Sequence, residues 1–139
     1  MMYEGVFLMQ ERKLVAEKEI EINVYDIDAM GIVSNIVYVR WFEDLRTAFI
    51  NQYMTYSEMM KFNISPILMR TEADYKVPLT IHDKPVGRCW LVKVSRMKWE
   101  LEFEIATEDK VHCTGYQKGG FYNVVDEKIA QTPKVFLEI

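Results

Sequence analysis

The chain has 139 residues and a mass of 16.5 kDa, which suits a single domain over residues 1–139 with its own hydrophobic core. Half of the residues are hydrophobic and 27% are charged, as in soluble globular proteins, and a net charge of −4 argues against nucleic-acid binding. No apolar run approaches the length of a membrane span, and residues 1–13 lack the pattern of a signal peptide, so we expect a cytoplasmic protein.

The cysteines and histidines give no sign of a metal site. Cys89 and Cys113 form no CxxC motif, and we interpret them as free, partly buried thiols in a reducing compartment. His82 and His112 belong to no cluster with metal-ligand spacing. We therefore expect no metal and no bound cofactor, and any chemistry must come from carboxylates, hydroxyls or backbone amides.

Periodicity divides the first half of the chain into a strand and a long helix. Residues 18–24 alternate apolar and polar side chains, which predicts a half-buried strand. Residues 36–54 carry apolar side chains three and four positions apart, which predicts a largely buried helix. Ser34 or Asn35 is expected to supply the N-cap side chain of this helix.

Strands dominate the second half of the chain. A short helical turn and a loop ending at Pro66 lead into a predicted strand over residues 67–77. Residues 86–95 and 98–107 predict a hairpin that turns near Arg96. One further strand is expected over residues 110–125, followed by a turn and a tail. The second arm of the hairpin has its apolar side chains on one face, and these are Trp99, Leu101, Phe103 and Ile105.

This order of elements predicts an α+β fold in which a curved antiparallel sheet covers one buried helix. A single helix of this kind cannot bury its apolar surface by itself, so the sheet must curl around it. The open edges of such a sheet favour pairing with another chain. We therefore expect a homo-oligomer with a dimer as its minimum.

The junction between the first strand and the helix, residues 25–35 (YDIDAMGIVSN), carries a candidate site. Asp28 precedes Ser34 by six residues, and Gly31 permits a tight turn between them. The free amides at residues 34–37 can polarise a carbonyl oxygen, and a carboxylate beside them suits an activated acyl group such as a thioester. The alternative is that Asp28 only caps a turn, as aspartate commonly does.

The stretch DIDAMGIVSNIVYVRWFEDLR resembles the leading motif of the hotdog-fold acyl-CoA thioesterases, the 4-hydroxybenzoyl-CoA thioesterase-like group. The matching positions are Asp28, Gly31, Val33, Asn35, Tyr38, Phe42, Glu43 and Arg46. The resemblance implies a hotdog fold, with one central helix wrapped by about five antiparallel strands, and hydrolysis of an acyl-CoA to free acid and coenzyme A. It also implies a site at a subunit boundary, in a homodimer or homotetramer.

The resemblance further implies the roles of individual residues. Asp28 would be the catalytic carboxylate, as nucleophile or general base, and the backbone N–H near Asn35 would polarise the thioester carbonyl. Some relatives carry His or Tyr where Asn35 stands, so its amide is credited before its side chain. The candidate substrate-binding residues are Gly31, Val33, Ser34, Tyr38 and Phe42. Coenzyme A enters only as part of the substrate, and acyl carrier protein is an alternative carrier.

Other candidate residues and functions are weighed beside these. We interpret Asp26 as a strand-end cap, with a share in the chemistry of Asp28 as the alternative. Glu43 and Arg46 are interpreted as an exposed helix pair, with a packing or interface role as the alternative implied by the resemblance, and His112 as facing solvent or a partner. One rival function is a non-catalytic module that binds acyl or aromatic ligands. The other is a hotdog hydratase or dehydratase, which resembles families with a His a few residues after the Asp, and no His follows Asp28 there.

Overall fold

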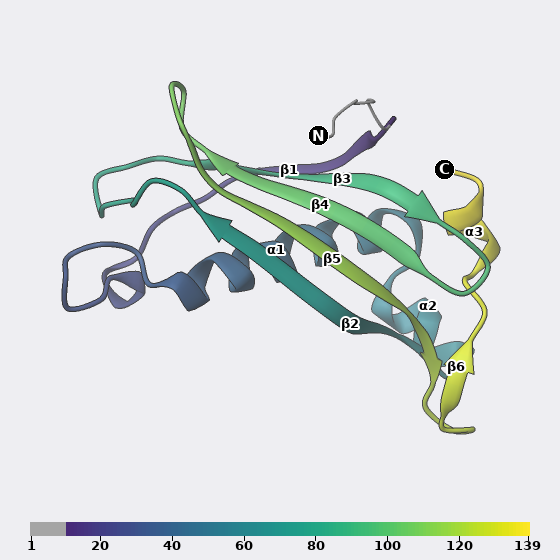
Figure 1. The fold of residues 1–139 in the computed structure, drawn as a ribbon. Coiled ribbons are helices and arrows are strands. Elements are labelled where there is room, and N and C mark those ends of the chain that lie inside the picture. Colours follow the sequence, from purple (N-terminus) through teal and green to yellow (C-terminus); the bar gives the residue numbers. More distant parts are fainter. Residues whose placement is uncertain (1–10) are drawn as a thin grey trace.

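The computed structural model describes residues 11–139. The expectation that residues 1–13 are not a signal peptide therefore falls mostly outside the described residues. A long helix, α1 (Asn35–Tyr53), lies against one face of a curved antiparallel sheet (Figure 1). The strand order is β1-β3-β4-β5-β2, and a short β6 pairs with the end of β5. This is the hotdog arrangement expected from the sequence.

The helix and the hairpin lie close to their predicted positions. The strands are β1 (Lys13–Glu19), β2 (Ile64–Tyr75), β3 (Val86–Val94), β4 (Trp99–Ala106), β5 (Val111–Asn123) and β6 (Lys128–Ala130). The shorter helices are the 3₁₀ helix η1 (Val24–Asp26), α2 (Tyr56–Lys61) and α3 (Lys134–Leu137). The sequence predicted only a turn and a tail where β6 and α3 are found.

The prediction of a strand over residues 18–24 is wrong. β1 spans Lys13–Glu19, and after it the chain leaves the sheet. The next contact with the neighbouring strand is a single hydrogen bond of 3.0 Å from the N–H of Ile20 to the carbonyl of Pro85. Proline has no N–H to return, so the ladder ends there. Val24 then turns outward, with 81% of its surface exposed.

The loop predicted to end at Pro66 is shorter than expected, because Pro66 lies inside β2 and is paired with Phe121. β2 is the last strand of the sheet, with β5 as its neighbour on one side only. A proline is tolerated in an edge strand when its nitrogen faces away from the ladder. β2 therefore keeps its pairing through a residue that commonly interrupts strands.

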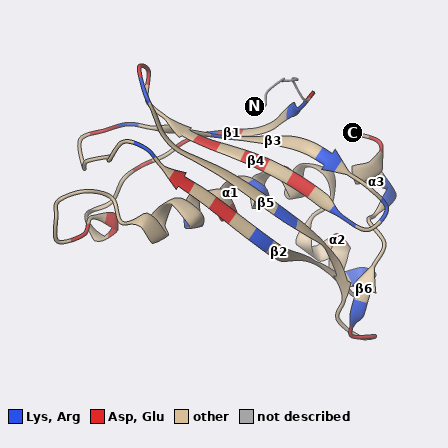
Figure 2. Ribbon diagram, in the orientation of Figure 1, with Lys and Arg blue, Asp and Glu red and all other residues tan. Residues whose placement is uncertain are grey.

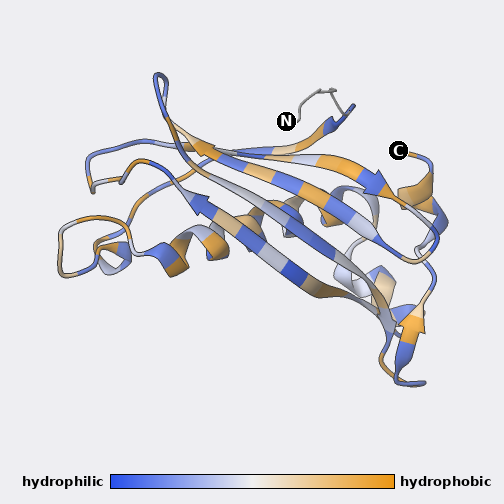
Figure 3. Cartoon of the chain, viewed as in Figure 1, coloured by the Kyte–Doolittle hydropathy of each residue, from blue (hydrophilic) through white to orange (hydrophobic). Residues whose placement is uncertain are grey.

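The core lies between α1 and the inner face of the sheet. The alternation predicted for β4 is confirmed, and it is visible as alternating colours along the strand in Figure 3. Phe42 of α1 has no exposed surface and stacks on Phe103 of β4, with ring centroids 4.7 Å apart. A Cβ at position 115 of β5 would come within 2.4 Å of the Phe42 ring, so only glycine permits this approach. Phe42 thus fixes the distance between helix and sheet.

Charged residues recur along the strands of the sheet (Figure 2), and in β4 they alternate with the buried residues that face α1. Arg88 of β3 contacts Glu17 of β1 at 2.7 Å and Glu104 of β4 at 3.3 Å. Arg12 pairs with Glu102 at 2.7 Å. Ion pairs this exposed add little to stability. They keep the outer face polar, while the inner face packs on α1.

Two of the expectations for polar residues are wrong. Arg46 is not part of an exposed pair but has the packing role that was the alternative, because only 14% of its side chain is exposed and it bonds to the buried Gln117. His112 does not face solvent, since it is 4% exposed. Its Nδ1 lies 2.9 Å from the carbonyl of Val77 and its Nε2 lies 2.8 Å from Oγ1 of Thr107. A carbonyl can only accept, so the Nδ1 atom carries the proton.

Candidate functional site

A buried carboxylate caps η1 just before the candidate site. Asp26 is 6% exposed, and its Oδ2 accepts a hydrogen bond of 2.8 Å from the N–H of Asn23. The carbonyl of Asp26 accepts the N–H of Ser34 at 2.9 Å, which joins this turn to the start of α1. The prediction that Asp26 caps a strand end is wrong, because no strand ends at this position and its carboxylate caps the 3₁₀ helix η1 instead.

Asp28 begins a tight loop and is held by that loop's own amides. Its N–H donates to the carbonyl of Ile32 at 2.8 Å, and its carbonyl accepts the N–H of Gly31 at 3.0 Å. Its Oδ1 accepts the N–H of Met30 at 2.8 Å and that of Ile32 at 3.4 Å. Gly31 has a φ of +80°, which explains the glycine. The loop orients an exposed carboxylate whose Oδ2 has no hydrogen-bond partner among residues 11–139.

The first amides of α1 differ in whether they are already bonded. Of the four amides singled out in the sequence, that of Ser34 donates to Asp26 and that of Val37 donates to Ser34. Within the described part of the chain, the amides of Asn35 and Ile36 have no acceptor. The candidate donors for a ligand oxygen are therefore these two N–H groups, at the positive end of a 19-residue helix.

Ser34 is the N-cap residue of α1, but neither side chain predicted as a cap makes a capping hydrogen bond. Asn35 is exposed as the first residue of the helix. The start of α1 is fixed by other means, because the N–H of Val33 donates to the carbonyl of Leu79 at 2.9 Å. The helix start is therefore tied to the loop that follows β2, and its free amides receive no capping hydrogen bond from a side chain of the described residues.

The predicted substrate-binding residues fall into two groups. Gly31 and Ser34 reach the surface beside Asp28 and Asn35. Val33, Tyr38 and Phe42 are 2%, 3% and 0% exposed, so they support the site from inside the core and present almost no surface to a ligand. Burial raises the pKa of Tyr38 to about 12, and its phenol stays protonated.

Tyr75 also contacts the candidate site, although no sequence pattern predicted it. It is the last residue of β2, and its hydroxyl donates to the carbonyl of Asn35 at 3.1 Å. Its ring makes an edge contact with Tyr38, with centroids 5.5 Å apart. No local pattern marks this residue, because the contact joins positions 40 apart in the chain. Only the pairing of β2 with the sheet brings it to the helix start.

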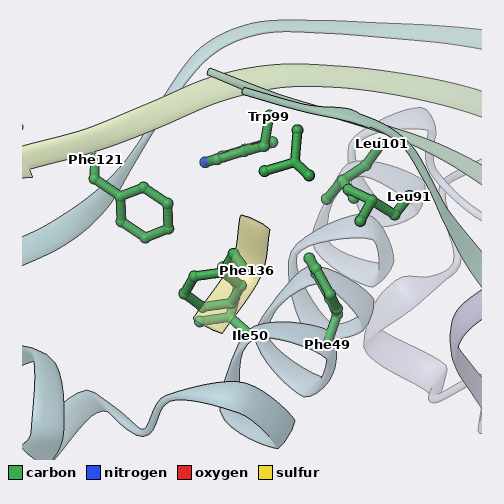
Figure 4. Close-up of a pocket in the computed structure, with 8 residues that line it drawn as sticks. Phe49, Ile50, Leu91, Trp99, Leu101, Phe121 and Phe136 are labelled. Atoms are coloured by element: carbon green, nitrogen blue, oxygen red, sulfur yellow. The ribbon is translucent and has the colours of Figure 1, made fainter. Parts of the chain in front are cut away.

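Two hollows lie near α1 without including Asp28. An open groove of about 430 Å³ runs beside the helix, with Tyr25 and Arg40 among its lining residues. An enclosed apolar cavity of about 10 Å³ lies between the sheet, α3 and the last turns of α1, where Phe49 contributes to its wall (Figure 4). Phe49 is about 21 Å along the helix axis from Asn35, taking a rise of about 1.5 Å per residue. Neither hollow places an acyl group beside the carboxylate.

Residues 11–139 carry neither a metal-binding cluster nor a membrane-spanning helix. No group of three or more His, Cys, Asp or Glu side chains there is arranged to hold a metal ion. No helix in that range has the length and apolarity needed to cross a membrane. Cys89 and Cys113 are both buried and unpaired, as expected.

Comparisons with known proteins agree with the fold and the motif. The model of the thioesterase-like superfamily matches residues 22–139. A protein of Bacillus subtilis provisionally named as the acyl-CoA thioesterase YneP is 35% identical over 92 residues, covering 66% of this chain and 67% of its own. A protein of Aquifex aeolicus provisionally named as an esterase is 29% identical over 119 residues, covering 85% and 91%.

A solved structure supports the fold independently. The DHNA-CoA thioesterase of Staphylococcus aureus superposes with a TM-score of 0.79 at 24% identity, covering 88% of this chain and 84% of its own. At that identity the likeness concerns the fold alone. The match to the superfamily covers most of the chain, including the whole of the candidate site. The chain therefore belongs to the thioesterase-like superfamily, as a thioester hydrolase with the hotdog fold.

Proposed function

We propose that this protein hydrolyses acyl-CoA thioesters to free acid and coenzyme A, with Asp28 as the catalytic carboxylate. The observation that carries the proposal is the pair of unbonded N–H groups of Asn35 and Ile36, in the same short segment as an exposed, oriented carboxylate. Backbone donors aimed at a carbonyl oxygen stabilise the charge that develops there during acyl transfer. The segment thus supplies both parts that thioester hydrolysis needs.

The two carboxylate oxygens of Asp28 have different roles in this proposal. Oδ1 accepts hydrogen bonds from the loop amides and so orients the carboxylate, while Oδ2 is available to react with the substrate or with water. As a nucleophile, Oδ2 attacks the thioester carbon, the C–S bond breaks, and water then hydrolyses the resulting anhydride. As a general base, it takes a proton from a water molecule whose oxygen attacks the same carbon. Both routes release one acid and one thiol.

We further propose that a second copy of the chain completes the acyl-binding site. The exposed apolar residues around the start of α1 include Val24, Tyr25 and Met30, each more than 80% exposed, and Ile36 at 63%. β2 offers an edge to pair with, where Leu68 and Met69 are 40% and 43% exposed. Covering these surfaces would enclose an acyl group beside Asp28. We propose a homodimer or homotetramer on these grounds.

The carrier and the location are proposals of the same kind. Coenzyme A is favoured by the acyl-CoA thioesterase name of a relative, with acyl carrier protein as the alternative. Two buried, unpaired cysteines agree with a cytoplasmic location.

A non-catalytic binding module is the second candidate function, and a specific observation favours it. Asp28 bonds the amides of Met30 and Ile32, as a residue serving only as a turn cap would. In that case the free helix amides would hold a ligand carbonyl without any chemistry at it.

One experiment separates the two candidates. The protein is mixed with short-chain, long-chain and aromatic acyl-CoAs, and free thiol and melting temperature are both measured. We expect catalytic thiol release from at least one member of the panel. A rise in melting temperature without thiol release, from a folded protein, would establish the binding module instead.

A further inference from the structure

The hydroxyl of Tyr75 is bonded to the first peptide group of α1. It donates to the carbonyl oxygen of Asn35 at 3.1 Å. The phenol ring is held by an edge contact with Tyr38, whose own ring contacts Trp41 at 5.3 Å. The backbone next to Tyr75 is also held to the sheet, because the N–H of Lys76 donates to a carbonyl of β5 at 2.9 Å. Tyr75 is therefore fixed from both its ring and its backbone.

The bonded carbonyl shares a peptide group with one of the two free amides. The C=O of Asn35 and the N–H of Ile36 belong to the same planar trans unit, so they point in opposite directions. The carbonyl points along α1, and the N–H points out of the helix start, where it has no acceptor among residues 11–139. A hydrogen bond to the carbonyl fixes the plane of this group and polarises it, which makes the N–H a stronger donor.

We propose that Tyr75 is a positioning residue for thioester hydrolysis, holding and polarising the Asn35–Ile36 peptide so that the Ile36 N–H donates to the developing oxyanion. The inference rests on the proposed function and adds the group that supports one of its two donors. Tyr75 acts through the peptide and does not itself touch the reacting atoms.

The state and position of the phenol agree with this role. Burial, followed by the neighbouring Cys113, raises the pKa of Tyr75, so its hydroxyl stays protonated and remains a donor at neutral pH. The residue is 45% exposed, which places it at the rim of the site and not in the deep core. Its loss should therefore affect the helix start more than the stability of the fold.

The test removes one hydroxyl group and compares the kinetic constants of this variant with those of a matched control variant. Tyr75→Phe keeps the ring contact with Tyr38 and removes only the bond to Asn35. Tyr116→Phe is the control, because it removes a hydrogen bond of 2.8 Å to Glu100 on the charged outer face of the sheet. With the acyl-CoA that the wild type hydrolyses fastest, we expect Tyr75→Phe to lower kcat about 3- to 10-fold with KM changed less than about 2-fold. Tyr116→Phe should leave both constants unchanged.

An infrared measurement adds a readout that a merely structural role would not move. The same acyl-CoA, labelled with ¹³C at the thioester carbonyl, is bound to Asp28→Asn with and without Tyr75→Phe. We expect the carbonyl stretch to shift to lower frequency on binding to Asp28→Asn, and to shift less when Tyr75→Phe is added, because the donor is weaker.

The possible outcomes distinguish this inference from the proposed function. An active wild type with kcat and carbonyl frequency both unaffected by Tyr75→Phe would overturn the role of Tyr75 and leave the thioesterase proposal in place. Equal losses of kcat in Tyr75→Phe and Tyr116→Phe would also overturn it, because the effect would then be general. A wild type that releases no thiol from any acyl-CoA would overturn both.

Discussion

Arg46 of α1 donates a hydrogen bond of 2.6 Å from Nη1 to Oε1 of Gln117, a side chain on β5 with no exposed surface. Gln117 in turn donates to Oγ1 of Thr71 on β2 at 3.4 Å. The guanidinium also pairs with Glu43 and lies 5.8 Å from the ring centroid of Trp99. A polar chain thus crosses the core from the helix to the edge strand of the sheet.

Removing the Arg46 guanidinium from this series of hydrogen bonds should lower the stability of the fold. Arg46→Met keeps the length of the side chain but leaves the buried carbonyl of Gln117 without its donor, which costs about 1–3 kcal/mol of unfolding free energy. Arg40→Met on the same helix is the control, because Arg40 is exposed and its change should stay within about 0.5 kcal/mol. Urea unfolding measures both, and equal effects would show that the Arg46 contact contributes nothing.

The loop that orients Asp28 depends on the backbone at Gly31. A side chain there meets no atom within 4 Å, so the cost of substitution comes from the φ of +80° alone. Gly31→Ala should lower the unfolding free energy by about 1 kcal/mol and should also lower kcat. Gly31→Asn should lower the unfolding free energy and kcat less than Gly31→Ala does, because asparagine tolerates a positive φ better than alanine. If alanine and asparagine gave the same loss, the backbone conformation would not be the cause.

Both cysteines should be inert in the folded protein. Burial raises the pKa of Cys89 and of Cys113 to about 12, so each thiol stays protonated well above neutral pH. At about pH 8, an aromatic disulfide reagent should detect no thiol in the native protein and both thiols in denaturant. Rapid labelling of the native protein would contradict the burial of these groups.

The same shifts predict how stability depends on pH. The unfolded thiols ionise near the ordinary pKa of 9.0, while the folded ones hold their protons until about pH 12. The folded state therefore binds more protons than the unfolded state in this range of pH. The stability that the buried, protonated thiols contribute is complete below about pH 9 and is lost as the pH rises toward 12. Cys89→Ala/Cys113→Ala should weaken this decline, as measured by denaturant unfolding at a series of pH values.

The edge of β2 should mediate assembly. We expect light scattering to give at least twice the monomer mass of 16.5 kDa. Leu68→Lys/Met69→Lys places charges on this edge and should favour the monomer, with loss of turnover because the site is then incomplete. Val125→Lys, in an exposed turn, is the control. A monomeric and fully active wild type would contradict the shared site.

Much of the fold could be predicted from the sequence because its signals are local. The helix over Asn35–Tyr53 follows from apolar spacing, and the β3–β4 hairpin follows from alternation. The first strand was misplaced because residues 18–24 also alternate apolar and polar side chains, whereas the ladder ends at Pro85, which has no N–H to donate. Alternation shows which side chains can share a face, but not where a partner strand stops.

The residues of the candidate site could likewise be predicted only where the signal is local in the sequence. Asp28, Gly31 and the free amides lie in one continuous segment, so the motif could indicate them together. Tyr75 reaches the helix start only through the pairing of β2, and His112 is buried by contacts with distant residues. Arg46 looked like an exposed helical residue because its partner, Gln117, is 71 positions away. Contacts of this kind depend on the tertiary fold and leave no local pattern.

Thiol release by Asp28→Asn, compared with that of the wild type, tests the catalytic role of this carboxylate most directly. Asparagine keeps an oxygen that can accept from Met30 and Ile32, so the loop and the melting temperature should be preserved. Without the carboxylate, kcat should fall by about 10² or more. Asp126→Asn, in the exposed turn between β5 and β6, should remain fully active. Full activity of Asp28→Asn would show that this carboxylate is not the catalytic group.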